Sequence, residues 1–298
     1  MEVARITCWS TSRGCAPGFP LYAGGCVGND ENGKYILSQV KEHGIDDTYM
    51  RTIDGVPTSY TDAMVERSGG RTRTFFHCRG ANACLGLDQI EAMVTSAKIF
   101  HLGYLLLLDS LDRPDPEYGV VGARALKSLR EMGYRTSVDL VSEQSDRFNK
   151  VVLPCLPYVD YLIINEIEAS KCSGLTIRKD DGTLDWENLK ESARILIGKG
   201  VRGQVSLHMP EGGFTRLANG EEYFAASKRV TPEQIVSCVG AGDAFCAGML
   251  YAVHQGFEPK RALDFANMSA RFNLFDATST GGAPAVEEIM RSMASCNE

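Results

Sequence analysis

The stretch Tyr158-Val159-Asp160-Tyr161-Leu162-Ile163-Ile164 runs directly into the polar segment Asn165-Glu166-Ile167-Glu168. A short apolar run of this kind predicts a strand that is buried on both faces, as in a parallel sheet covered by helices. We therefore expect an interior strand over 158–164. The polar residues that follow it should lie at its carboxyl end.

Apolar runs and helical patterns alternate on both sides of this strand. Before it we expect an apolar strand at 99–108, a helix near 119–132, a strand over 136–141 and a further helix. After it we expect a helix at 184–198, a strand at 203–207 and helices at 244–255 and 259–275. This rhythm predicts a single α/β domain with a doubly wound, mostly parallel sheet, which binds ligands beyond the carboxyl ends of its strands.

The first third of the chain predicts a different arrangement. We expect a strand over 21–28, a helix over 33–43 that Gly44 ends, and a hairpin formed by 59–66 and 71–77. Residues 1–20 show no periodicity beyond one candidate short strand, Val3 to Trp9. The domain is therefore predicted over 21–298, with 1–20 as a separate segment.

Composition narrows the class of protein. The chain has 298 residues, a net charge of −7 and scattered basic residues, which argues against nucleic-acid and membrane partners. Its ten cysteines contain no CxxC pair and no Cys/His spacing typical of zinc sites. Residues 1–20 lack the apolar core of a signal peptide, and Leu105 to Leu108 is too short to span a bilayer. We expect a reduced, cytoplasmic protein.

The turn Val239-Gly240-Ala241-Gly242-Asp243-Ala244-Phe245 leads into a helical pattern. Such a turn presents backbone N–H groups at the positive end of a helix dipole, where phosphate binds well. Asp243 is placed to accept a proton from a hydroxyl group beside that phosphate. The alternative is a glycine turn with Asp243 as an N-capping residue.

Polar residues at the predicted strand ends are further candidates. Asn165 and Glu168 lie one helical turn apart and suit Mg²⁺, directly or through its waters; the alternative is a capping pair at a helix start. Asp139 also ends a strand. His208 alone is more typical of a structural histidine, and the turn containing Asn82 is more typical of structure than of function.

Several motifs, in order, resemble those of the ribokinase-like (PfkB) family of carbohydrate and nucleoside kinases from about Leu21 to the C-terminus. The stretch Gly25-Cys26-Val27-Gly28-Asn29-Asp30-Glu31-Asn32-Gly33 is similar to the family's G-x-V-G-x-D-x-x-G, and 77–82 is similar to a segment ending in Gly-Ala-Asn. Asn165-x-x-Glu168 resembles N-x-x-E, and 240–243 resembles G-A-G-D. Phe265-Ala266-Asn267 and Gly281-Gly282 resemble nucleotide-side segments.

The resemblance implies a three-layer α/β/α sandwich with a small β lid, and ATP-dependent phosphorylation of a hydroxyl group, most often of a sugar. It implies Asp243 as the general base, an anion hole of Gly240, Ala241 and Gly242, and Mg²⁺ organised by Asn165 and Glu168. The residues that it places at the nucleotide are Asn165, Ser206, His208, Gly212, Gly242, Asn267 and Gly282. Those that it places at the substrate are Asp243, Asp139 and Asn82.

Three departures from the family pattern carry expectations of their own. Ser237-Cys238-Val239 replaces the usual Asp-Thr before the glycine turn, which makes a K⁺ requirement doubtful, and Ser206-Leu207-His208 replaces T-L-G. The family's first strand, its substrate-binding Asp and part of its lid have no counterpart in 1–20. We therefore expect a reduced lid and a gap in the middle of the sheet, with a second subunit of a homodimer covering the site if this chain is active.

A sugar kinase is the leading hypothesis. A nucleoside kinase of the same family is the nearest alternative, and a non-catalytic, nucleotide-binding remnant is the next. A dinucleotide-dependent oxidoreductase is disfavoured because no G-x-G-x-x-G joins a first strand to a helix.

Overall fold

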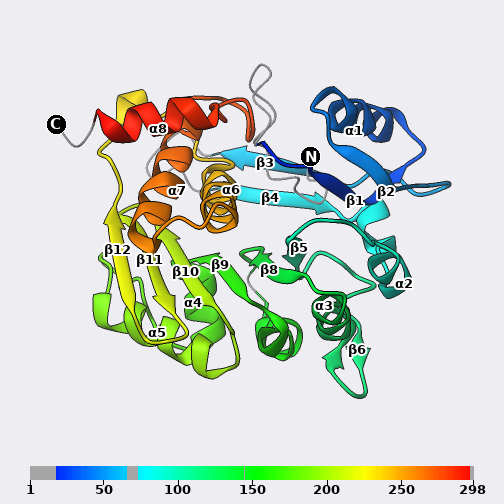
Figure 1. Ribbon diagram of the computed structural model, residues 1–298, viewed down its shortest axis with the longest axis horizontal. Coiled ribbons are helices and arrows are strands. Elements are labelled where there is room, and N and C mark those ends of the chain that lie inside the picture. Colours follow the sequence, from blue (N-terminus) through cyan, green and yellow to red (C-terminus); the bar gives the residue numbers. More distant parts are fainter. Residues whose placement is uncertain (1–17, 66–72, 144, 296–298) are drawn as a thin grey trace.

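The computed structural model describes residues 18–65, 73–143 and 145–295, so the candidate strand Val3 to Trp9 lies outside the described residues. Its centre is a six-stranded sheet (Figure 1) in the order β12 (Glu222–Ala226), β11 (Gly212–Leu217), β10 (Gln204–Met209), β9 (Tyr161–Asn165), β8 (Arg135–Leu140) and β5 (Ile99–Leu105). The pairs from β5 to β10 are parallel, whereas β11 and β12 extend the sheet as antiparallel strands. The sheet is therefore mostly parallel, as predicted.

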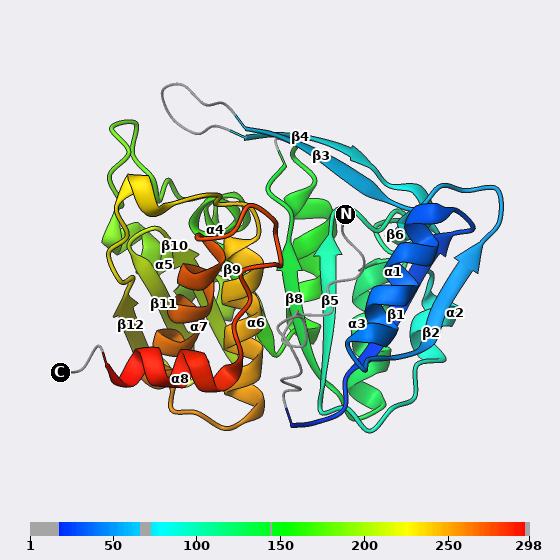
Figure 2. The same cartoon turned by 90° about the horizontal axis from the view of Figure 1, so that it is seen from above.

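Helices cover both faces of this sheet. One layer holds α3 (Val121–Glu131), α4 (Glu166–Ser173) and α5 (Trp186–Gly198), and the other holds α6 (Ala241–His254), α7 (Pro259–Asn273) and α8 (Val286–Ala294), as Figures 1 and 2 show. In β9, Leu162 and Ile164 belong to one buried cluster, and Ile163 belongs to the other. The predicted strand that is buried on both faces is confirmed, and the fold is a three-layer α/β/α sandwich.

The first described segment forms a smaller unit. β1 (Tyr22–Gly28) pairs in parallel with β2 (Asp46–Ile53), and α1 (Glu31–Glu42) packs Ile36 and Val40 on them. Gly44 adopts the left-handed conformation with φ 66°, which confirms its predicted role after the helix. A short helix, α2 (Leu87–Glu91), follows later in the chain.

The two sheets are not joined in the described part of the chain. The six-stranded sheet ends at β5, and β1 pairs only with β2 among the described strands. A cavity of about 190 Å³ lies between β1 and β5, with Tyr22, Gly24, Met93 and Phe100 in its walls. Phe19 stacks on His254 with ring centroids 3.9 Å apart, and both residues line this cavity.

A separate hairpin lies beyond the carboxyl end of β5 (Figure 2). Its strands β3 (Tyr60–Val65) and β4 (Arg73–Cys78) pair antiparallel, so the predicted hairpin is confirmed. The 3₁₀ turn η1 (Gly80–Cys84) follows it. A two-stranded pair, β6 (Pro114–Asp115) and β7 (Gly119–Val120), precedes α3.

Some elements differ from the sequence predictions. The helix expected before residue 158 is a π turn, η2 (Phe148–Val152), followed by a 3₁₀ turn, η3 (Leu153–Tyr158), so β9 begins only at Tyr161. Pro154 and Pro157 lack the N–H groups that a regular α-helix needs there. The strands β2, β11 and β12, the helix α8 and the short turn η4 (Pro232–Gln234) were not predicted.

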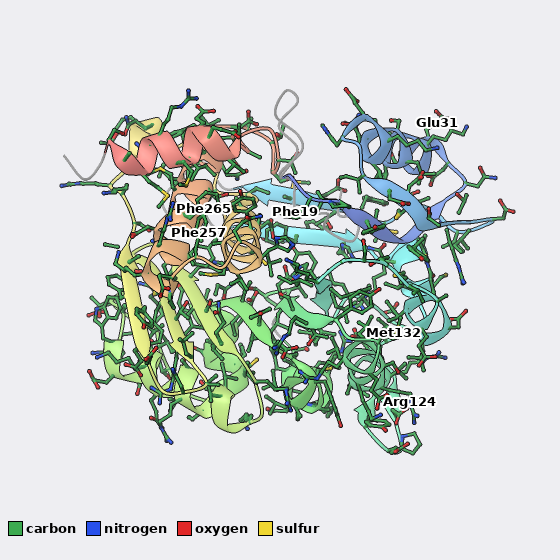
Figure 3. The ribbon with its side chains drawn as sticks, viewed as in Figure 1. Phe19, Glu31, Arg124, Met132, Phe257 and Phe265 are labelled. Atoms are coloured by element: carbon green, nitrogen blue, oxygen red, sulfur yellow. The ribbon has the colours of Figure 1, made fainter. Side chains whose placement is uncertain are left out.

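Aromatic side chains fix the helical layer that carries the glycine turn. Phe265 of α7 stacks on Tyr251 of α6 with ring centroids 5.2 Å apart. It also meets Phe257 edge-on at 5.7 Å, and both phenylalanines are labelled in Figure 3. These contacts hold the C-terminal part of α6 against α7. Within the described ranges, no helix has both the length and the apolarity needed to cross a bilayer.

Candidate functional site

The centre of the site is the start of α6. Gly240 is the N-cap residue and has φ 86°, and a Cβ atom there would lie 2.3 Å from the carbonyl oxygen of Ser279. Only glycine fits both constraints. Asp243 lies in the first turn of the helix and is not its cap, which rules out the N-capping alternative. The first-turn N–H groups of Ala241, Gly242 and Asp243 lie at the positive end of the helix dipole and suit an anion.

Tyr104, at the carboxyl end of β5, fixes the Asp243 side chain. Its hydroxyl donates to Oδ1 of Asp243 at 2.6 Å. The two residues are 139 positions apart in the chain. No local pattern could have revealed this contact, and Tyr104 was not among the predicted site residues.

His208 packs beneath the glycine turn. A Cβ atom on Gly242 would lie 2.8 Å from Cε1 of His208, so the turn and the imidazole are in close contact. Burial lowers the pKa of His208 to about 4. The imidazole is therefore neutral at neutral pH and supports the turn without adding charge to it.

Asn165 and Glu168 form a capping box at the start of α4. Oδ1 of Asn165 accepts from the N–H groups of Ile167 and Glu168, and the Glu168 carboxylate accepts from Asn165 N at 3.0 Å and from Ser142 Oγ at 2.8 Å. Glu168 is 4% exposed, and burial raises its pKa to about 8. The capping alternative is therefore present in the structure, and both Glu168 oxygens already have partners.

Two predicted residues lie in the interior and not at the open edge of the sheet. The Ser206 hydroxyl is fully buried and shares a hydrogen bond with Thr215 Oγ1 at 2.8 Å. Asp139 is 6% exposed, and its Oδ1 lies 3.6 Å from Nε2 of His101. Both side chains are buried, because helices cover both faces of β8 and β10.

The remaining nucleotide-side candidates pack at the end of β12 and at the end of α7. Asn267 donates to the carbonyl of Ala225 at 2.8 Å, and Gly212 packs against the same carbonyl so closely that a Cβ atom on it would lie only 2.2 Å away. Gly282 packs on the end of α7, where a Cβ would lie 2.8 Å from Asn273 Cα. Asn273 in turn donates to Val239 O at 2.8 Å. The segment after α7 therefore lies against the glycine turn.

On the other side of the site, Asn82 lies in η1. Its N–H donates to Ser59 Oγ at 3.0 Å, and Ser110 Oγ donates to the neighbouring carbonyl of Ala83 at 2.6 Å. Asn82 is thus held between the base of the hairpin and the loop after β5. Asp30, from the first glycine motif, accepts from Gly33 N and from both Thr58 N and Thr58 Oγ1, so that motif fixes the local backbone.

The chain is similar to known proteins in sequence and in fold. The chain is 23% identical to ribokinase from Schizosaccharomyces pombe over 266 residues, which covers 89% of this chain and 77% of that protein. It is 26% identical to adenosine kinase from Dictyostelium discoideum over 247 residues, covering 80% and 68%. A structure from E. coli, described as a ribokinase II with ATP and Mg²⁺, superposes with a TM-score of 0.74 at 20% identity, covering 94% and 84%.

The structural likeness identifies the fold as ribokinase-like. The model of the pfkB family of carbohydrate kinases matches residues 18–285, which include both sheets, the hairpin and the glycine turn, and this chain therefore belongs to that family.

Proposed function

We propose that this carbohydrate kinase transfers the γ-phosphoryl group of ATP to a hydroxyl group of a small sugar or sugar-like substrate, with Asp243 as the general base. The observation that carries the proposal is the start of α6. There, a carboxylate held by Tyr104 lies in the same helical turn as N–H groups suited to phosphate. A base and an anion site so close together match the two needs of phosphoryl transfer.

In the proposed reaction, the substrate oxygen attacks the γ-phosphorus of ATP, and its proton passes to the Asp243 carboxylate. The bond from the γ-phosphorus to the bridging oxygen breaks, and ADP leaves with that oxygen. The N–H groups of the first turn of α6 stabilise the charge on the transferring phosphoryl group. Tyr104 keeps the carboxylate in one orientation during the transfer.

Direct contact and contact through water are the two predicted ways for Asn165 and Glu168 to bind Mg²⁺. Glu168 is buried, each of its oxygens accepts one hydrogen bond, and Asn165 Oδ1 caps α4, which favours contact with the ion through water. We propose that they act on the ion through its water shell, with Glu168 ionising when the metal is present. When bound with ATP, Mg²⁺ supplies positive charge that neutralises phosphate oxygens.

We propose that ATP lies along the segment after α7, where Asn267 and Gly282 shape the loops, and that the sugar lies near Asn82 under the hairpin. Ser206, His208 and Gly212 then support the nucleotide side through packing. Ser237 and Val239 occupy positions where the family has an acidic and a hydroxyl-bearing residue. Because these two residues are replaced, we propose that the activity depends only weakly on K⁺.

The ribose unit of adenosine offers hydroxyl groups too, and the similarity to an adenosine kinase keeps a nucleoside substrate as the second candidate. An ATP-consumption screen over sugars, sugar acids and nucleosides separates the two. Turnover with sugars supports the proposal, and turnover with nucleosides alone replaces it with the second candidate. ATP binding without turnover on any acceptor identifies a non-catalytic remnant.

The hairpin supports a proposal about assembly. Met64, Phe75 and Phe76 on β3 and β4 are 59%, 51% and 59% exposed. Exposed apolar side chains on a two-stranded sheet favour contact with another protein surface. We propose that a homodimer in the cytoplasm covers them. Light scattering should give twice the mass of the chain, and Phe76→Lys should give a monomer.

A further inference from the structure

A second cluster of ligating side chains lies beneath the catalytic turn. His101 from β5, Asp139 from β8 and Cys246 from α6 bring one nitrogen, one oxygen and one sulfur atom within 4.8 Å of one another. Cys246 follows Asp243 by three positions on α6, so the cluster lies one helical turn deeper than the proposed base. None of the three residues has a task in the phosphoryl transfer proposed above.

One oxygen of the buried Asp139 carboxylate lacks a hydrogen-bond partner among the described residues. Asp139 is 6% exposed, and the oxygen is its Oδ1. A buried polar atom in this condition is rare and is often explained by a bound ion or water. The carboxylate oxygen faces His101, whose side chain is 10% exposed.

His101 is oriented as a ligand would be. Its Nδ1 lies 3.1 Å from Ser137 Oγ, and its Nε2 lies 3.6 Å from Asp139 Oδ1. When Nδ1 donates to the serine, Nε2 presents its lone pair to the cluster. Metal-bound histidines commonly have this second hydrogen bond, because it fixes the tautomer and the ring.

Gly103 of β5 packs closely beside this pair of side chains. The backbone of Gly103 faces the pair, and a Cβ atom there would lie 2.7 Å from Asp139 Oδ1 and 3.2 Å from His101 Nε2. A side chain at position 103 would therefore displace both ligand atoms, and glycine leaves them in place. The cavity between β1 and β5 is lined by His101, Gly103 and Ala247. Of the three ligands, His101 lines this cavity, so an ion that enters the cluster from the cavity meets His101 first.

We propose that His101, Asp139 and Cys246 form a binding site for Zn²⁺. Mg²⁺ and Ca²⁺ prefer oxygen ligands, whereas a mixed nitrogen, oxygen and sulfur set suits a transition metal. Tetrahedral Zn²⁺ separates such ligand atoms by about 3.3–3.6 Å, a spacing that the His101–Asp139 pair already has. Binding requires a modest shift of the Cys246 side chain, and it releases the thiol proton to solvent.

The test uses Co²⁺, which replaces Zn²⁺ and gives a near-ultraviolet charge-transfer band only when a thiolate binds it. The purified full chain is titrated with Co²⁺ in excess Mg²⁺, so that oxygen-only sites, including the one near Glu168, are occupied. We expect the band to saturate at about one Co²⁺ per chain and to disappear when Zn²⁺ is added. Absence of the band from the wild-type chain would overturn the proposal.

Variants locate the site. Cys246→Ser should abolish the band, and Asp139→Asn should weaken Co²⁺ binding roughly tenfold or more. The matched control is Cys155→Ser, since Cys155 is equally buried but bonds to Val151 O, away from the cluster. The control should keep the band. Persistence of the band in Cys246→Ser, or its loss in Cys155→Ser with the fold intact by circular dichroism, would contradict the assignment. If Cys246→Ser does not fold, His101→Gln takes its place with the same expected loss.

Discussion

The hydrogen bond from Tyr104 to Asp243 gives a prediction that the structure makes quantitative. Tyr104→Phe removes one hydroxyl group and leaves the ring, so it deletes the 2.6 Å bond with little change in packing. Asp243 remains in place on the first turn of α6, but its carboxylate loses one contact that orients it.

Two effects of this change oppose each other. A hydrogen bond to an ionised group contributes about 1.5–3 kcal/mol, and its loss makes the carboxylate a stronger base. If about half of this energy is felt in the transition state, the rate rises by about three- to tenfold. Against this, a misplacement of about 1 Å costs about a hundredfold. Orientation therefore dominates, and we expect kcat to fall by about 10- to 30-fold.

The assay is steady-state ADP release with the best acceptor from the substrate screen. The KM for ATP should stay within about twofold of the wild-type value, because Tyr104 orients the base and does not hold the nucleotide. Tyr118→Phe is the matched control, because it also removes one tyrosine hydroxyl group. Tyr118 packs under Arg124, which is labelled in Figure 3, and is far from the glycine turn in the sequence. An unchanged or higher kcat in Tyr104→Phe would refute the reasoning.

Three further predictions test other parts of the site. Glu168→Gln should raise the Mg²⁺ concentration for half-maximal rate roughly tenfold, because the carboxylate next to the water shell loses its charge; an unchanged titration would leave Glu168 only its capping role. Burial lowers the pKa of His208 to about 4 in the folded chain. Between pH 4 and 6.5 the unfolded chain therefore binds more protons than the folded chain, so the free energy of unfolding should rise with pH over this range. His208→Gln should flatten that part of the curve of unfolding free energy against pH, measured by urea denaturation, and an unchanged slope would show that another group causes it. Replacing Na⁺ by K⁺ should change kcat by less than about twofold, and strong stimulation would contradict the argument from Ser237 and Val239.

The sequence predicted the fold best where a regular pattern of apolar residues marks the buried positions. Leu162, Ile163 and Ile164 were predicted to face two cores, and they do. The glycine turn was also predictable, because Gly240 adopts a conformation that other residues avoid. The antiparallel strands β11 and β12 were not predicted. Gly212-Gly213 indicates a turn, and the alternation of apolar and polar residues after it is weak.

The site was harder to predict than the fold. Asn165 and Glu168 satisfy the requirements of a capping box and of a metal site with the same residue types at the same spacing, and the chain alone does not separate them. Ser206 and Asp139 were expected at the site because they lie near strand ends. Their side chains are buried because helices cover both faces of the sheet, and a position near a strand end does not reveal this. Tyr104 and His101 reach the site only through the tertiary fold.

The gap that the family resemblance predicts corresponds to a feature of the described chain. Among the described strands, β5 and β1 each have an unpaired edge, and the cavity between them is bordered mainly by apolar residues such as Met93 and Phe100. Unpaired strand edges of this kind favour pairing with a further strand.

The central claim is that Asp243 takes the proton from the substrate. The most direct measurement is a single-turnover experiment with Asp243→Asn, in which the amide keeps the shape of the carboxylate but is not a base. We predict a rate of phosphoryl transfer lower by about a thousandfold, with the Kd for ATP within about twofold of the wild-type value. Loss of ATP binding with the rate of transfer intact would contradict the claim.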